Sequence, residues 1–223
     1  MRRLKLSERS LPNYTNGEEI MNMVTHIAGG GIGLLLSTLC CIKAAIQGNI
    51  PGLIGSVIFA LSITGLYTMS SIYHGLRTVT SKKVMQILDH CTIYFLICGT
   101  YTPILLSAFL PVYPGICIGL MVLLWSLAAL AITLTAIDLK KYNIFSMICY
   151  VCMGWSILPF MPQAMNVLTN AGFYILLSGG IAYTIGAVLY GIGSKKPWFH
   201  SIFHIFVVIG STLQAISILF YAL

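Results

Sequence analysis

The chain has 223 residues, of which 58% are hydrophobic and only 8% are charged, and its formal net charge is +7. Soluble globular domains carry about 25% charged residues, so this composition excludes an ordinary water-soluble protein and indicates a chain that lies mostly in a membrane. Only residues 1–17 read as polar, and they lack the apolar core and cleavage site of a signal peptide. We expect a cytosolic N-terminal tail at 1–17 and a single transmembrane domain at 18–223.

Seven apolar segments follow the tail. A helix that crosses a bilayer needs about 20 mostly apolar residues, and glycine, proline and charged residues divide the sequence into segments of that size. The segments lie at 21–46, 51–76, 84–110, 114–136, 143–161, 171–193 and 199–221. The sequence therefore predicts an all-α integral membrane protein, a seven-transmembrane helix bundle, in which Pro103 and Pro159 kink their helices.

The basic residues predict how this bundle is oriented, because lysine and arginine near span ends are retained on the cytoplasmic side. With the exception of Lys43, they precede the first segment or follow the second, fourth and sixth: Arg2, Arg3, Lys5, Arg9, Arg77, Lys82, Lys83, Lys140, Lys141, Lys195 and Lys196. The N-terminus is therefore expected in the cytoplasm and the C-terminus outside, in a multi-pass protein of the cell membrane. This retention pattern accounts for nearly all of the net charge without a nucleic-acid partner.

Several ionisable side chains lie within the apolar segments. Such residues are rare inside membrane spans, and each one is a functional-site hypothesis. They share a position near the cytoplasmic end of their predicted helices: His26, His74, Asp89, His90, His200 and His204. This common depth predicts one site on the cytoplasmic side.

The last two of these histidines, His200 and His204, are spaced to bind a metal ion. Residues four apart project from one helix face, about 6 Å apart along the axis. The intervening Ser-Ile-Phe lacks the glutamate of the HExxH zinc-protease motif, and the alternative is two histidines hydrogen-bonded to neighbouring helices. A third ligand decides between these readings, and His74 lies at the right depth, with Ser70 one turn before it.

Asp89 is the one acid placed well inside an apolar segment. Burial of an uncompensated carboxylate is expensive, and a nearby cation would remove that cost. The alternative is an ion pair at the membrane interface, with Arg77, Lys82 or Lys83. His90 adjoins Asp89 but points about 100° away on a helix, so it is the weaker candidate ligand.

A further polar face opens the first segment, where Glu19, Asn22 and His26 recur at helical spacing. Glu18 and Glu19 also suit a helix N-terminus, so capping is the alternative interpretation. His26 lies deeper and needs a partner. We expect these three residues to orient the metal ligands through contacts on the side away from the metal ion, or to connect neighbouring helices. The roles of His26 and His90 stay open.

Three polar motifs are thus spaced along the chain. They are Glu19-x-x-Asn22-x-x-x-His26, Ser70-x-x-x-His74 followed by Asp89, and His200-x-x-x-His204. The set resembles that of the hemolysin III family, which is similar to the progestin and adiponectin receptors, and the resemblance covers nearly the whole chain.

The resemblance implies seven helices, with the N-terminus inside, and a zinc ion held by His74, His200 and His204. It also implies that Ser70 and Asp89 lie close to a zinc-bound water, and that the activity is that of a lipid amide hydrolase of the ceramidase type.

Three functions follow from these residues and the resemblance. The first is a zinc-dependent hydrolase of lipid amide or ester bonds in membrane lipid homeostasis, with Asp89 orienting the attacking water or acting as general base and Ser70 donating a hydrogen bond. The second is a receptor-like or membrane-state sensor with a structural zinc. The third is a pore-forming cytolysin, against which the scarcity of polar residues along the spans argues. Membrane lipids are the expected partners, and the sequence leaves the substrate and the oligomeric state open.

Overall fold

The computed structural model describes residues 6–193 and 196–223, and this part of the chain is helical throughout, without a β-strand. The start of the predicted tail, with Arg2, Arg3 and Lys5, lies outside the described residues, as does Lys195.

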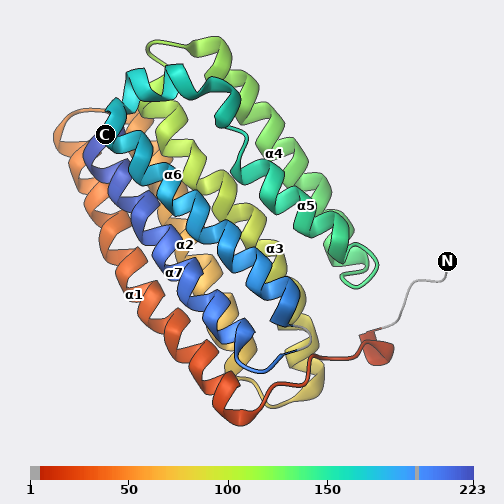
Figure 1. Ribbon diagram of the computed structural model, residues 1–223. Helices are drawn as coiled ribbons and strands as arrows, with labels where there is room; N and C mark the ends of the chain where they lie inside the picture. The colour runs from red at the N-terminus through yellow and green to blue at the C-terminus, as the bar shows by residue number, and fades with distance from the viewer. Residues whose placement is uncertain (1–5, 194–195) are drawn as a thin grey trace.

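The described residues form seven α-helices, which run in alternating directions through the bundle (Figure 1). They are α1 (Asn16–Ile46), α2 (Ile50–Gly75), α3 (Val79–Pro103), α4 (Pro114–Ile137), α5 (Asn143–Gly154), α6 (Met161–Gly193) and α7 (Phe199–Ser217). Two π-helical segments, η2 (Ile104–Phe109) and η4 (Ile218–Ala222), extend α3 and α7, and two short 3₁₀ turns lie at η1 (Leu6–Glu8) and η3 (Leu158–Phe160). The π-helical segment η2 begins directly after Pro103, where proline breaks the regular helical hydrogen bonds.

Six helical stretches of the described chain are long and apolar enough to cross a membrane. These stretches confirm an all-helical membrane protein. The fifth predicted segment differs from the sequence prediction: α5 has 12 residues, η3 contains Pro159, and α6 contains Thr169 at a φ of 62°, outside the helical region. A 12-residue helix rises about 18 Å, less than the roughly 30 Å hydrocarbon core of a bilayer. The residues from Asn143 to Ile192 therefore form one long stretch with a bend, and the number of spans stays a prediction.

The core of the bundle consists of α1, α2, α3, α6 and α7. The helix α1 packs against α2 and α7, α2 also packs against α3, and α6 packs against α7, whereas α4 lies outside α3 (Figure 1). The short helix α5 makes few contacts with its neighbours. This loose attachment leaves room between α5 and α6.

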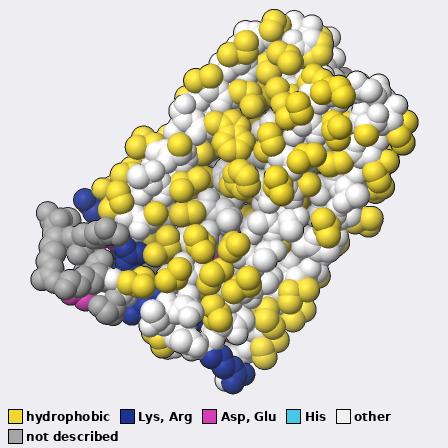
Figure 2. All heavy atoms as spheres, turned by 180° about the vertical axis from the view of Figure 1, so that it is seen from behind, with side chains coloured by type: hydrophobic (Ala, Val, Ile, Leu, Met, Phe, Trp, Pro, Cys, Tyr) yellow, Lys and Arg dark blue, Asp and Glu magenta, His cyan; other side chains and the backbone are white. Residues whose placement is uncertain are grey.

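The outer surface is apolar along most of its length. Large hydrophobic side chains such as Ile27, Leu35, Leu61, Val122 and Phe220 are exposed. Figure 2 shows hydrophobic side chains spread along the whole length of one face, with lysine and arginine gathered at one end. Lys43, the exception to the predicted charge pattern, donates a hydrogen bond from Nζ to the carbonyl oxygen of Leu219, at 2.7 Å. The surface is that of a multi-pass protein of the cell membrane.

Candidate metal centre

Three histidine side chains meet where the end of α2 faces the start of α7. His74 is next to last in α2, and His200 and His204 lie in the first two turns of α7. All three are buried, with exposed fractions of 3%, 7% and 1%. The Nε2 atom of His200 is 3.4 Å from that of His74 and 3.1 Å from that of His204. The fold therefore brings together the three residues that the sequence singles out as ligands.

The neighbours of this cluster fix the tautomers of two neutral imidazoles. His74 Nδ1 lies 2.7 Å from Glu19 Oε2, and because a carboxylate only accepts, Nδ1 carries the proton and Nε2 does not. His204 Nδ1 lies 3.2 Å from the carbonyl oxygen of Asn22, which selects the same tautomer. Two unprotonated Nε2 atoms thus face His200 Nε2, which has at most one proton to donate.

A metal ion between these nitrogen atoms would use every free lone pair. Tetrahedral coordination with metal–nitrogen distances of about 2.0–2.1 Å separates two nitrogen ligands by about 3.4 Å. The two separations that involve His200, 3.1 and 3.4 Å, are close to that value, and all three ligand atoms lie within 4.8 Å of one another. The cluster of His74, His200 and His204 could therefore hold a metal ion.

Glu19 and Asn22 lie directly behind the cluster. Glu19 Oε1 forms an ion pair with Lys82 Nζ at 2.6 Å, and Lys82 also donates to the carbonyl oxygen of Leu76 at 3.2 Å. The amide Nδ2 of Asn22 is 3.4 Å from His74 Nδ1. One of the three basic residues considered as partners of Asp89 is thus paired with Glu19 instead.

His26 joins the cluster by stacking. Its ring centroid is 3.7 Å from that of His204, and the two planes differ by 20°. It is not among the three residues whose ligand atoms converge. The structure thus places His26 beside one ligand and outside the ligand group.

Asp89 and Ser70 line the same cavity as His200 and His204. The Asp89 side chain is 13% exposed. Ser70 Oγ is buried and faces the Asp89 carboxyl group, although the hydrogen bond between them lacks good geometry. A carboxylate and a neighbouring hydroxyl thus lie together on the cavity wall next to the histidines.

His90 is engaged elsewhere. Its Nδ1 lies 2.8 Å from the carbonyl oxygen of Gln86, and its Nε2 lies 3.2 Å from Tyr190 Oη. Tyr150 Oη donates to the His90 carbonyl oxygen at 2.9 Å. Because Tyr150 belongs to α5 and Tyr190 to α6, His90 connects α3 to both helices and has no nitrogen left for a metal ion.

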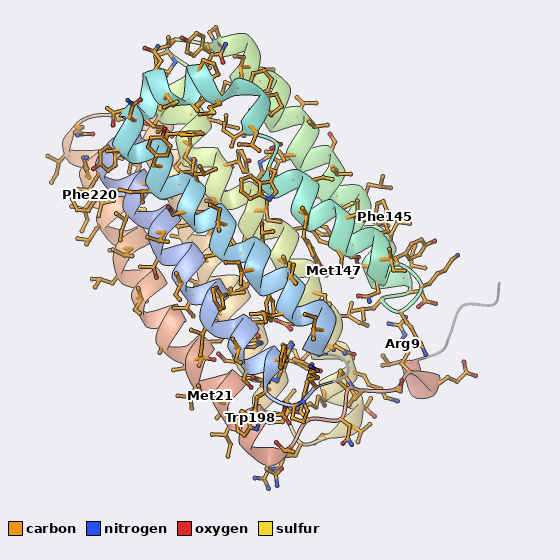
Figure 3. The ribbon with its side chains drawn as sticks, in the orientation of Figure 1. Arg9, Met21, Phe145, Met147, Trp198 and Phe220 are labelled. Carbon is orange, nitrogen blue, oxygen red and sulfur yellow. The ribbon has the colours of Figure 1, made fainter. Side chains whose placement is uncertain are left out.

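The cavity extends from the histidines into the bundle between α3, α5, α6 and α7. Its volume is about 140 Å³, and most of its lining residues are apolar or aromatic. Met147 of α5 lies on this wall, between α5 and α6 (Figure 3). The lining runs along α7 from His204 to Gln214, about 15 Å at 1.5 Å per residue. These dimensions suit an extended apolar chain.

The segment before α1 covers the histidines from the other side. The ring of Tyr14 stacks on that of His200, with centroids 4.8 Å apart and planes 20° apart. Burial, reinforced by Tyr190 and Glu19, raises the pKa of Tyr14, so its phenol stays neutral. Residues 8–15 also line a second, polar depression, which meets the apolar cavity at Asn143, Tyr190 and His200.

The loop before α7 is tied to the same segment. Thr15 caps α1 in a reciprocal capping box with Glu18, and Glu18 Oε1 accepts a hydrogen bond from the Trp198 backbone at 2.7 Å. Trp198 has a φ of 67°, a strained backbone conformation for a bulky residue. The hydrogen bond between Glu18 and Trp198 therefore holds the first turn of α7, and with it His200, against the start of α1.

Comparisons with known proteins match almost the whole chain. A family model described as haemolysin-III related matches residues 14–215. The chain is 36% identical over 212 residues to the hemolysin-3 homolog of Bacillus subtilis (strain 168), covering 93% of this chain and 96% of that protein. It is 34% identical over 210 residues to hemolysin-3 of Bacillus cereus, covering 92% of each chain. The human monocyte to macrophage differentiation factor is 25% identical over 169 residues, covering 72% of this chain and 67% of that protein.

Proposed function

This chain belongs to the haemolysin-III related family, and we propose that it is a zinc-dependent hydrolase of lipid amide or ester bonds that acts in membrane lipid homeostasis. The proposal rests on the buried cluster of His74, His200 and His204 at the end of an apolar cavity. Three protein ligands with an open fourth position are typical of catalytic zinc, whereas structural zinc usually has four.

The surroundings of the cluster favour zinc. Neutral imidazole ligands suit this metal, and zinc-binding histidines usually donate their second ring nitrogen to a carboxylate or a carbonyl oxygen. His74 donates to Glu19 and His204 donates to the Asn22 carbonyl. Zinc in such a site supplies Lewis-acid activation of water at neutral pH.

Asp89 and Ser70 provide the remaining chemistry. The Asp89 carboxylate accepts a proton from the attacking water as the new C–O bond forms at the carbonyl carbon. It returns that proton to the leaving amine or alkoxide as the C–N or C–O bond breaks. The Ser70 hydroxyl donates a hydrogen bond to the carbonyl oxygen as negative charge develops there.

The arrangement in the membrane fits a lipid substrate. We place seven spans, with α5 and η3 together as the fifth, the start of α1 in the cytoplasm and the C-terminus outside. The histidines of α7 then lie about 5–10 Å below its cytoplasmic end at 1.5 Å per residue. Lipid acyl linkages occupy a similar zone, and the apolar cavity accommodates the acyl chain.

Two other functions compete with hydrolysis. A receptor-like or membrane-state sensor would use the metal ion for structure only, and would keep its function when Asp89 is replaced. One relative is named hemolysin-3 and another a hemolysin-3 homolog, and these names suggest a pore-forming cytolysin as a further candidate. Against a pore, the cavity of the described chain is mostly apolar and lacks the polar lining of an aqueous path.

The test compares purified wild type with two variants, His200→Ala/His204→Ala and Asp89→Asn. We expect zinc in the wild type and in Asp89→Asn, and loss of zinc from the double variant. Asp89→Asn should lower the rate of fatty acid release from a lipid amide or ester by about 10²–10⁴-fold, because it removes the general base.

Each competing function has its own outcome. An equal zinc content in the wild type and the double variant would show that these histidines do not bind the metal ion. Zinc-loaded wild type that releases no fatty acid from ceramide, phospholipid or a related amide would favour the sensor. Release of a trapped dye from vesicles without lipid cleavage would favour the cytolysin.

A further inference from the structure

His26 is a buried histidine without a hydrogen bond. The residue is only 3% exposed to solvent. Neither of its ring nitrogen atoms, Nδ1 and Nε2, has a hydrogen-bond partner among the described residues. Buried polar atoms are almost always hydrogen-bonded, and an unpaired one is strongly destabilising. A polar group from outside the protein therefore has to supply the missing hydrogen bonds.

Packing holds this ring at the site without using its nitrogen atoms. One face stacks on His204, and the ring meets Tyr67 edge to face, with centroids 5.0 Å apart and planes 86° apart. Tyr67 Oη is itself paired with Ser211 Oγ, at 2.5 Å. His26 lines the apolar cavity together with Ser70 and Asp89. The molecule that fills the cavity beside the histidine cluster is therefore the one that His26 meets.

The chemistry of a neutral imidazole restricts what this molecule must offer. One ring nitrogen donates and the other accepts, so a full set of hydrogen bonds needs both an acceptor and a donor. An amide provides a carbonyl oxygen and an N–H, whereas the linkage of an ester provides acceptors only. A site built to bind an N–H discriminates strongly against the analogue that lacks it, because its own polar group is left unpaired.

We propose that His26 is a substrate-binding residue that hydrogen-bonds the polar linkage of the lipid in the cavity and selects an amide over the corresponding ester. The inference rests on the proposed function and chooses between the two linkages that the proposed function leaves open. It also gives His26 a direct contact with the substrate, in place of a supporting role behind the metal ligands.

The experiment uses two lipids that differ at one atom, N-lauroylethanolamine and ethylene glycol monolaurate. Binding of each is measured by calorimetry on the zinc-loaded protein in nanodiscs, with Asp89→Asn present in every sample, including the one with the wild-type His26, so that hydrolysis is slow. The variant His26→Phe keeps a ring to stack on His204 and removes both nitrogen atoms. Tyr94→Phe is the control, because Tyr94 is buried against Thr135 and does not line the cavity.

We expect the wild type and Tyr94→Phe to bind the amide at least about tenfold more tightly than the ester, as expected when a buried hydrogen-bonding group is left unpaired. His26→Phe should bind the two lipids within about twofold of each other, for the same reason, and should take up as much zinc as the wild type. His26→Gln, which keeps a donor and an acceptor, should recover part of the preference.

The contrary outcomes are distinct. His26 does not recognise the substrate if His26→Phe keeps the preference for the amide or loses zinc. In that case His26 stabilises the fold or the metal site. If the wild type binds the ester and the amide equally, the proposal that His26 selects the amide is wrong. The proposal that the protein hydrolyses lipids is then unaffected. If the wild type binds neither lipid, the lipid substrate of the proposed function fails first, and the role of His26 fails with it.

Discussion

Glu19 occupies a central position among the polar side chains of the site. One carboxylate oxygen accepts from His74 at 2.7 Å and the other pairs with Lys82 at 2.6 Å. The buried Lys82 ammonium compensates the negative charge, so the carboxylate can stay ionised behind a ligand. Such a partner orients the imidazole and raises its basicity toward the metal ion.

Glu19→Gln should therefore weaken the zinc binding that we propose. The amide keeps the size of the side chain but loses the charge that polarises His74, and loss of such a partner typically lowers metal affinity about 10–100-fold, or about 1.4–2.8 kcal/mol. Competition with a chromophoric zinc chelator measures the change. Asp138→Asn, the same loss of charge at the end of α4, should leave the affinity within about twofold of wild type, because Asp138 Oδ1 accepts a hydrogen bond from the Lys141 backbone, away from the histidines. An unchanged affinity in Glu19→Gln would mean that the contact with His74 is structural only.

At the scale of single residues, the sequence predicts which three histidines come together but not every residue that contacts them. His74, His200 and His204 could be found because helical spacing and common depth are properties of local sequence. Tyr14 could not, because its contact with His200 spans most of the chain and depends on how the segment before α1 folds back. The ion pair of Lys82 with Glu19 was missed for the same reason, since Asp89 is nearer in sequence.

Among the helices, α1 is joined to its neighbours at Gly29. A Cβ atom added there would lie 2.7 Å from the Tyr67 ring of α2 and 2.7 Å from Val208 of α7. Two helices therefore approach α1 at a point where only glycine fits. Asn22 and His26 lie on the turns just before Gly29, so this contact also sets how closely they approach His74 and His204.

Gly29→Ala should destabilise the bundle, and Gly31→Ala should not. The new methyl group at position 29 forces Tyr67 or Val208 to move, which typically costs about 1–3 kcal/mol. At position 31 no atom lies within 4 Å of an added Cβ, so the higher helix propensity of alanine should leave stability equal or greater by up to about 1 kcal/mol. Thermal unfolding of the two variants in one detergent gives the comparison. Equal melting temperatures would show that α1 can shift at no cost.

The helices themselves were largely predictable, because long apolar segments bounded by charge and turn residues are strong signals. The exception is α5, where Gly154 and Pro159 stop the helix early and Thr169 bends the next one. Hydropathy does not register such breaks, since residues 143–161 stay apolar whether or not they form one helix. The looseness of α5 matters for function, because the cavity lies between α5 and α6.

Considered as a whole, the molecule joins a polar depression at one end to an apolar cavity along the helices, with the histidines between them. A ligand with a polar head and an apolar tail fits both parts at once. Gly180 of α6 lines the apolar part, and an added Cβ would meet Trp155 only at 3.7 Å, an ordinary contact. A larger side chain at position 180 would therefore extend into the cavity.

Gly180→Phe should obstruct the acyl chain and leave the metal site intact. We expect kcat/KM for a long-chain lipid amide to fall at least about tenfold, the effect of losing one or more methylene contacts in an apolar pocket, with zinc content unchanged. Gly119→Phe on α4 is the control, because an added Cβ there meets nothing within 4 Å. Equal effects of both substitutions would indicate a general disturbance of the bundle.

The orientation of the whole bundle decides from which side the histidines are reached, and it can be measured without any assay of activity. If the basic end is cytoplasmic, a cysteine at Gln47, in the turn between α1 and α2, lies outside the cell, and one at Lys140, after α4, lies inside. An impermeant maleimide added to intact cells should then label Gln47→Cys above the level of the native cysteines, and label Lys140→Cys only after permeabilisation. The reverse pattern would move His74, His200 and His204 to the outer leaflet. It would require the lipid substrate to be sought there, while leaving the metal centre and the cavity as they are.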